Sequence, residues 1–168
     1  MVIKMRAKIY SCVFSLLLIF IFIPYAFAYC NIEDKEVAKN NPNSKFSIGL
    51  AKNPRYIVKD DDKNFARNNP DTLFAEFIVK NPNYRVDDED VEFAKNNPDS
   101  KFASGITQNP SYRITDEDKV FARSNPNTKF AFGLVQNEHY RVDDEDRKYT
   151  RKNPDSKLAE FLTQNPTY

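Results

Sequence analysis

The sequence predicts an all-α solenoid of five 28-residue helical-hairpin repeats behind an N-terminal signal peptide. Three observations support this fold class. Asparagine-proline pairs, tyrosines and aspartates each recur at intervals of 28 residues, apolar side chains are spaced i, i+4, and the Asn-Pro pairs separate short stretches of helix-favouring residues. The proline series is Pro42, Pro70, Pro98, Pro126 and Pro154, the tyrosine series Tyr56, Tyr84, Tyr112, Tyr140 and Tyr168, and the aspartate series Asp34, Asp62, Asp90, Asp118 and Asp146. The series predict a single repeat domain over residues 29–168.

Residues 1–28 differ from the repeats. A basic start that includes Lys4 and Arg6 precedes an apolar run, and the segment ends in small residues two apart, Ala26 and Ala28. This order is typical of a secretory signal peptide, and we expect cleavage after Ala28 and export as a secreted, periplasmic or cell-surface protein. The alternative is an uncleaved signal anchor, which would then be the protein's only association with a membrane.

The composition of residues 29–168 limits the partners. Without the signal segment, 22 basic and 24 acidic residues remain, and this balance argues against nucleic-acid binding, which needs a clustered basic surplus. Cys30 is the only cysteine of the repeat domain, so no internal disulfide can form there. Cys30 is either a small apolar residue at the start of the array or the site of an intermolecular disulfide.

The first helix of each unit is predicted from its ends, as the third unit shows. Asp87 is a good N-cap, residues 88–90 place negative charge in the first turn, and Lys95 places positive charge in the last. Asn96 suits the C-terminal cap. The corresponding N-cap positions of the other units hold Asn31, Lys59, Thr115 and Asp143, of which only the lysine is a poor N-cap.

The second helix is expected to begin directly at the Asn-Pro pair. Asn97 would cap it, and Pro98 would be its first residue, where the missing amide costs nothing. The helix should run to about Gln108, since Asn109 and Pro110 end it.

Apolar residues of the second helix form one stripe, which predicts the core. Its members are Phe46, Phe74, Phe102, Phe130 and Leu158, followed four residues on by Leu50, Ile78, Ile106, Leu134 and Leu162. One unit buries too little to offset the entropy of ordering 28 residues, so the units should depend on their neighbours for stability. Mid-helix glycines at positions 49, 105 and 133 predict close approach of a neighbouring helix.

The charged runs need no ligand to explain them. Acidic clusters such as residues 87–90 lack the central glycine and terminal glutamate of a calcium-binding loop, and a helix N-terminus favours negative charge. We therefore predict no metal site and no cofactor. A basic row lies at the ends of the first helices, where cations are favoured; it comprises Lys39, Arg67, Lys95, Arg123 and Arg151.

A tyrosine-arginine pair recurs in the connector after the second helix and is the candidate binding edge. The pairs are Tyr84 and Arg85, Tyr112 and Arg113, and Tyr140 and Arg141. Two interpretations remain open. The arginines pair with acidic residues of an adjacent unit, or the ladder binds an acidic partner or a polysaccharide.

No catalytic constellation is visible in the sequence. His139 is the only histidine, and it lacks a recognisable nucleophile partner. We expect a non-enzymatic module that binds or scaffolds a macromolecule, either a protein or a polysaccharide. The alternative is a structural envelope or surface protein that self-associates end to end, because the predicted array has no polar capping repeats and the sequence stops at Tyr168 with both terminal faces unprotected.

Overall fold

A computed structural model describes residues 32–168 and divides the chain into two compact units, Met1–Asn40 and Asn41–Tyr168. The predicted signal peptide, its cleavage site, Cys30 and Asn31 lie outside the described residues. In the first unit, residues 32–40 are helical, at the place where the sequence predicts the first helix of repeat one.

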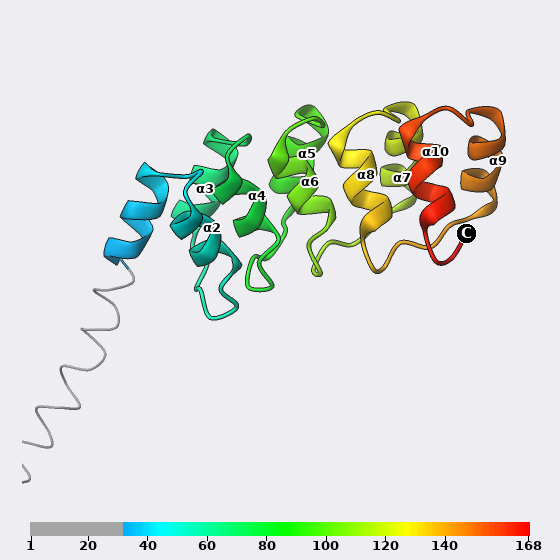
Figure 1. Cartoon of the computed structure of the whole chain (residues 1–168). Helices are drawn as coiled ribbons and strands as arrows, with labels where there is room; N and C mark the ends of the chain where they lie inside the picture. Colours follow the sequence, from blue (N-terminus) through cyan, green and yellow to red (C-terminus); the bar gives the residue numbers. More distant parts are fainter. Residues whose placement is uncertain (1–31) are drawn as a thin grey trace, which may run out of the picture. The chain divides into compact units, whose positions relative to one another are not determined.

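The second unit consists of short helices, and no strand occurs among residues 32–168 (Figure 1). The all-α repeat fold is thereby confirmed. The helices are α2 (Lys45–Lys52), α3 (Asp60–Asn68), α4 (Leu73–Val79), α5 (Asp88–Asn96), α6 (Lys101–Thr107), α7 (Asp116–Ser124), α8 (Lys129–Gln136), α9 (Asp144–Lys152) and α10 (Lys157–Gln164).

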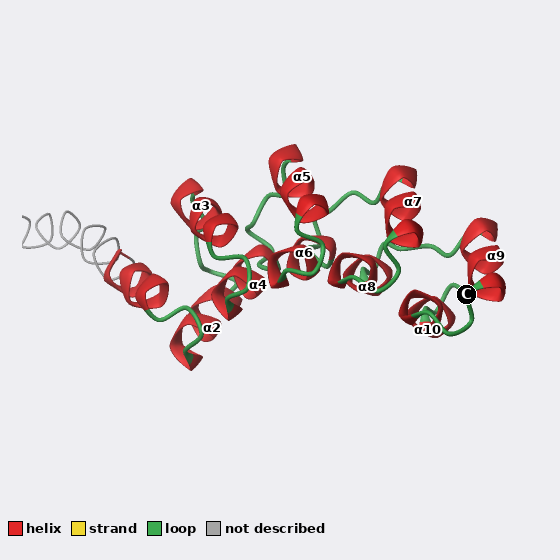
Figure 2. Ribbon diagram, turned by 90° about the horizontal axis from the view of Figure 1, so that it is seen from above, coloured by secondary structure: helices red, strands yellow, loops and turns green. Residues whose placement is uncertain are grey.

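Two rows of helices make up the second unit (Figure 2). The even-numbered helices form an inner row in which each contacts the next, from α2 through α4, α6 and α8 to α10. The odd-numbered helices form an outer row, and each contacts the inner helix that follows it in the chain. Each hairpin therefore pairs one outer helix with one inner helix, and successive hairpins join mainly through the inner row.

The start of the inner helix differs from the sequence prediction. Asn97 is the C-cap of outer helix α5, and the N-cap of α6 is Ser100, whose hydroxyl oxygen accepts from the Ala103 N–H at 3.0 Å. Pro98 lies in the turn between them, which is closed by a hydrogen bond from Ser100 N–H to the Asn97 carbonyl at 3.0 Å. The expectation that Asn97 caps the second helix and that Pro98 is its first residue is therefore wrong by about one turn. The other ends are close to those predicted, with Asp87, Thr115 and Asp143 as outer-helix N-caps.

The predicted apolar stripe forms the core of repeats two to five. Its eight members there are at most 1 % exposed: Phe74, Phe102, Phe130, Leu158, Ile78, Ile106, Leu134 and Leu162. Outer-helix aromatics meet three of them edge-on, as Phe93 does with Phe102 at a centroid distance of 5.2 Å. Phe46 of the first repeat differs, since it is 46 % exposed.

Hydrogen bonds join consecutive inner helices at both of their ends. At the N-terminal end, the N–H of the second helical residue donates to the proline carbonyl of the preceding repeat; the pairs are Phe74 to Pro42, Phe102 to Pro70, Phe130 to Pro98 and Leu158 to Pro126, at 2.8–3.1 Å. At the C-terminal end, a side-chain amide donates to a carbonyl of the preceding inner helix; the pairs are Asn81 to Ala51, Asn109 to Val79, Asn137 to Thr107 and Asn165 to Val135. These bonds satisfy helix-end groups that would otherwise be buried without partners.

The glycine prediction is confirmed for two of its three positions. A Cβ at Gly105 would lie 2.6 Å from the Glu76 carbonyl oxygen, and one at Gly133 would lie 2.8 Å from that of Ser104, both on the preceding inner helix. Within the described part of the chain, nothing lies within 4 Å of a Cβ placed at Gly49. The same residue type thus allows close helix packing in repeats three and four, whereas Gly49 in repeat one meets no described neighbour.

Alanine substitutions at two of these glycines are expected to have opposite effects. Gly105→Ala should destabilise the protein by about 1–3 kcal/mol, because the backbone of α4 must move away from the new methyl group. Gly49→Ala should stabilise it by about 0.5–1 kcal/mol, because alanine is the better helix former and meets no neighbour. Urea unfolding of dilute protein measures both changes. Effects of the same sign in the two variants would contradict this assignment.

Candidate functional site

The tyrosines of the predicted binding edge are buried. Tyr84, Tyr112 and Tyr140 are 0 %, 3 % and 2 % exposed, respectively, so they belong to the core and cannot form an exposed ladder with the arginines. The sequence-based expectation is corrected in this respect: only the arginines lie on the surface.

Each buried tyrosine in fact faces a buried aspartate of the next outer helix. The Tyr84 hydroxyl donates to Asp90 at 2.8 Å, and Tyr140 donates to Asp146 at the same distance. Both aspartates are 0 % exposed, and Asp90 also accepts from the Asp87 N–H at 3.2 Å. The carboxylate of Asp90 therefore has two roles: it caps the N-terminus of its own helix, and it binds the tyrosine that fixes the preceding connector.

Cations of the preceding outer helix complete this network. Arg67 donates to Asp90 at 2.8 Å, Lys95 lies 2.6 Å from Asp118, and Arg123 donates to Asp146. The basic row that the sequence explains by helix C-termini thus also joins successive outer helices. This pairing was not predicted from the sequence, although the strict 28-residue interval of the aspartate series indicated a structural role for the aspartates.

The protonation of the network follows from its burial. Burial first, and then the neighbouring carboxylates, raise the pKa values of Tyr56, Tyr84, Tyr112 and Tyr140 far above the ordinary value of 10.0. Burial also raises the pKa of Asp90, although the hydrogen bond from Tyr84 opposes that shift. All four hydroxyls therefore remain protonated, and those of Tyr56, Tyr84 and Tyr140 donate to aspartates, so the network is structural.

The connector arginines lie at the surface without acidic partners. Arg85, Arg113 and Arg141 are all exposed, and none forms an ion pair within residues 32–168. Arg141 donates instead to the carbonyls of Glu138 and Tyr140, at 2.7 and 2.9 Å. The interpretation in which these arginines pair with acids of an adjacent unit therefore does not hold in the described part of the chain.

Arg113 lines one surface groove together with the acidic residues Asp87, Asp88, Glu117 and Asp118, and two further grooves border these arginines. One, of about 630 Å³, is lined by Arg85, Arg113, Ser111 and the exposed His139. It places two guanidinium groups and an imidazole from three successive connectors around one hollow. All three groups can donate hydrogen bonds to an anionic ligand.

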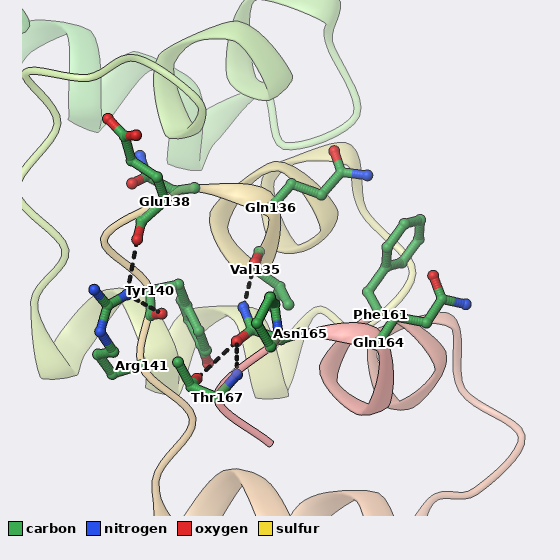
Figure 3. Close-up of a pocket in the computed structure, with 11 residues that line it drawn as sticks. Val135, Gln136, Glu138, Tyr140, Arg141, Phe161, Gln164, Asn165 and Thr167 are labelled. Carbon is green, nitrogen blue, oxygen red and sulfur yellow. Dashed lines mark hydrogen bonds between the residues drawn. The ribbon is translucent and has the colours of Figure 1, made fainter.

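The second groove, of about 610 Å³, lies between the C-terminal ends of α8 and α10 (Figure 3). Glu138 and Arg141 lie on one side of it, and Phe161 and Gln164 lie on the other. Beneath them, the Asn165 amide donates to the Val135 carbonyl at 2.9 Å, which holds the two helix ends together. This groove combines one arginine with the carboxylate of Glu138, whereas the first is lined by two arginines and by no acidic residue.

Other functional features are sparse in the described residues. Between residues 32 and 168, no group of three His, Cys, Asp or Glu side chains is placed to hold a metal ion. In the same range, every helix is too short or too polar to cross a bilayer. His139 Nε2 lies 3.6 Å from a Glu138 carboxylate oxygen, and both side chains are more than half exposed.

Comparison with known proteins identifies no relative. No protein-family model matches the chain, and neither a curated protein nor a solved structure matches it.

Proposed function

We propose that this chain is an exported, non-enzymatic binding module whose connector edge captures an acidic macromolecule, either an acidic polysaccharide or an acidic protein segment. The observation that carries the proposal is the groove in which Arg85 and Arg113 are exposed and have no acidic partner in the described chain. The features of residues 1–28 support export.

The rigidity of the edge supports a binding role. Each arginine directly follows a buried tyrosine. The tyrosines before Arg85 and Arg141 donate to buried aspartates, Tyr84 to Asp90 and Tyr140 to Asp146, both at 2.8 Å, whereas the Tyr112 hydroxyl before Arg113 has no hydrogen-bond partner among the described residues. The backbone that carries the guanidinium groups is therefore ordered before any ligand arrives, which lowers the entropy lost on binding. Arginine also suits carboxylate and sulfate groups, because its planar fork donates two parallel hydrogen bonds.

Removal of the three guanidinium groups is expected to weaken polyanion binding. The variant Arg85→Ala, Arg113→Ala, Arg141→Ala should bind polygalacturonate or poly-L-glutamate about tenfold more weakly, from a loss of roughly 0.5 kcal/mol for each exposed contact. Titration calorimetry at low salt measures the affinities, and uncharged dextran serves as the reference polymer. The wild-type affinity should fall as salt is added.

A matched variant distinguishes binding by the arginine edge from nonspecific attraction by the net charge of the protein. Lys129→Ala, Lys148→Ala, Lys152→Ala removes the same number of positive charges from exposed positions on α8 and α9. This variant should keep most of the affinity. An equal loss in both triple variants, or no binding of either polyanion by the wild type, would refute the proposal.

A further inference from the structure

We call the leading face of α2 the side that in every later inner helix packs against the preceding inner helix. Among residues 32–168, this face of α2 has no such neighbour. Phe46 is 46 % exposed, whereas its counterpart Phe102 is fully buried against the preceding repeat. The Phe46 N–H and the Asn53 side-chain amide find no acceptor among residues 32–168, although their counterparts in later repeats bond to the preceding inner helix or its turn. Gly49 has open space where Gly105 and Gly133 meet a helix. Four features on this face of α2 therefore lack the contacts that their counterparts make in later repeats.

The trailing face of α10 is the side against which a following inner helix would pack. This face carries a groove that could receive the leading face of an α2 helix. A hollow of about 290 Å³ lies behind this helix and is lined by Arg151, Pro154, Glu160 and Thr163 among others. Pro154 occupies the position at which Pro126 and the earlier prolines accept a hydrogen bond from the next repeat. The groove has room for one large side chain of the size of phenylalanine.

The two faces resemble an interface that the chain already contains. Helix α10 carries Glu160-Phe161 where α4 carries Glu76-Phe77, and the helix that packs behind α4 has a glycine, Gly105, at the contact. Helix α2 likewise carries Gly49 at that position. The trailing face of α10 and the leading face of α2 therefore share the Glu-Phe pair and the glycine of the contact between α4 and α6. Thr163 of α10 stands where α4 has Val79, as Thr107 does in the contact between α6 and α8.

We propose that a second copy of this chain docks α2 behind α10 and so continues the inner row from one molecule to the next. Phe46 of the incoming copy would fill the groove of about 290 Å³, its N–H would donate to the Pro154 carbonyl, and its Asn53 amide would bond at the C-terminal end of α10. The contact is heterologous, with different surfaces on the two partners, so each added copy leaves one surface of each kind free for the next copy. This proposal is independent of the arginine edge.

Substitutions on either face are expected to block the assembly. Gly49→Glu adds a carboxylate at a position where a Cβ meets none of residues 32–168, but in the complex it would be pressed against the neighbour's Glu160. Thr163→Arg adds bulk and charge to the exposed trailing face. The protein is expressed as the full sequence, its mature N-terminus is identified by mass spectrometry, and its size distribution is followed by sedimentation up to about 1 mM. Wild type should form oligomers that grow with concentration, and each variant should remain monomeric.

Mixing the variants tests the polarity of the contact. A Gly49→Glu chain keeps its trailing face and a Thr163→Arg chain keeps its leading face, so an equimolar mixture should form heterodimers and nothing larger. Lys129→Glu, an exposed charge change elsewhere on α8, should assemble like wild type, and helical circular dichroism should be unchanged in all variants. A monomeric wild type, assembly unchanged by either substitution, or no complex in the mixture would overturn the proposal. Polyanion binding by a monomeric wild type would leave the proposed function intact.

Discussion

Raising the pH above 10 is expected to unfold the helical array in a steep transition. Tyr56, Tyr84, Tyr112 and Tyr140 are buried, and their pKa values are raised by burial and by the adjacent carboxylates. Above pH 10 the unfolded chain loses these protons while the folded chain keeps them, so the free energy of unfolding falls as the pH rises. Below pH 10 both states are protonated, and the contribution of the four tyrosines to stability is fully present. Four such groups together give a slope approaching about 5 kcal/mol per pH unit.

Tyrosinate absorbance and helical circular dichroism, recorded during the same alkaline titration, measure this effect. The buried hydroxyls should ionise only as the helical signal is lost. Lysines lose their charge in the same range and weaken contacts such as Lys95 with Asp118, which acts in the same direction. Full ionisation of the tyrosines while the helices persist would show that the hydroxyls are not held in the network.

Removal of one buried aspartate is expected to be the most damaging single substitution. Asp90→Ala leaves the Tyr84 hydroxyl and the Asp87 N–H without their acceptor and takes the carboxylate from Arg67, which lies 2.8 Å away. We expect a loss of about 3–5 kcal/mol, because one partner of a buried charged network is removed while the others remain. Urea unfolding at neutral pH gives the value.

Two matched variants identify the cause of that loss. Asp88→Ala changes an exposed carboxylate in the first turn of the same helix and should cost no more than about 0.5–1 kcal/mol, as expected for the helix dipole alone. Asp90→Asn keeps the size and one acceptor oxygen, and should fall between the two. Equal losses for Asp88→Ala and Asp90→Ala would mean that the buried contacts contribute nothing beyond helix capping.

The elements of the fold were predictable because their signals are local. Asp87 as N-cap, Lys95 in the last turn and the spacing of Phe102 and Ile106 each act within one or two helical turns. Such features are visible in a single repeat, and five copies made them unambiguous. The apolar core positions of the inner helices in repeats two to five and the helix count per repeat could therefore be read from the sequence.

The position of Pro98 was misjudged because two residues compete as the N-cap of α6. Asn97 and Ser100 are both good N-caps, so local preference cannot choose between them. If Pro98 were the first helical residue, its carbonyl would bond to Phe102 within the helix. In the structure that carbonyl accepts from Phe130 of the next repeat, while Phe102 donates to Pro70. A contact between repeats thus determines where the helix begins.

The repeat period, the hairpin of two short helices and the apolar stripe follow from the amino-acid sequence, since each depends on neighbours along the chain. Which of the recurring polar residues are buried follows from the packing of one repeat against the next. Tyr84 and Arg85 recur with equal regularity, yet one lies in the core and the other on the surface. The reason is that burial depends on packing between repeats. Core residues and surface residues recur at the same interval of 28, so the interval does not distinguish them.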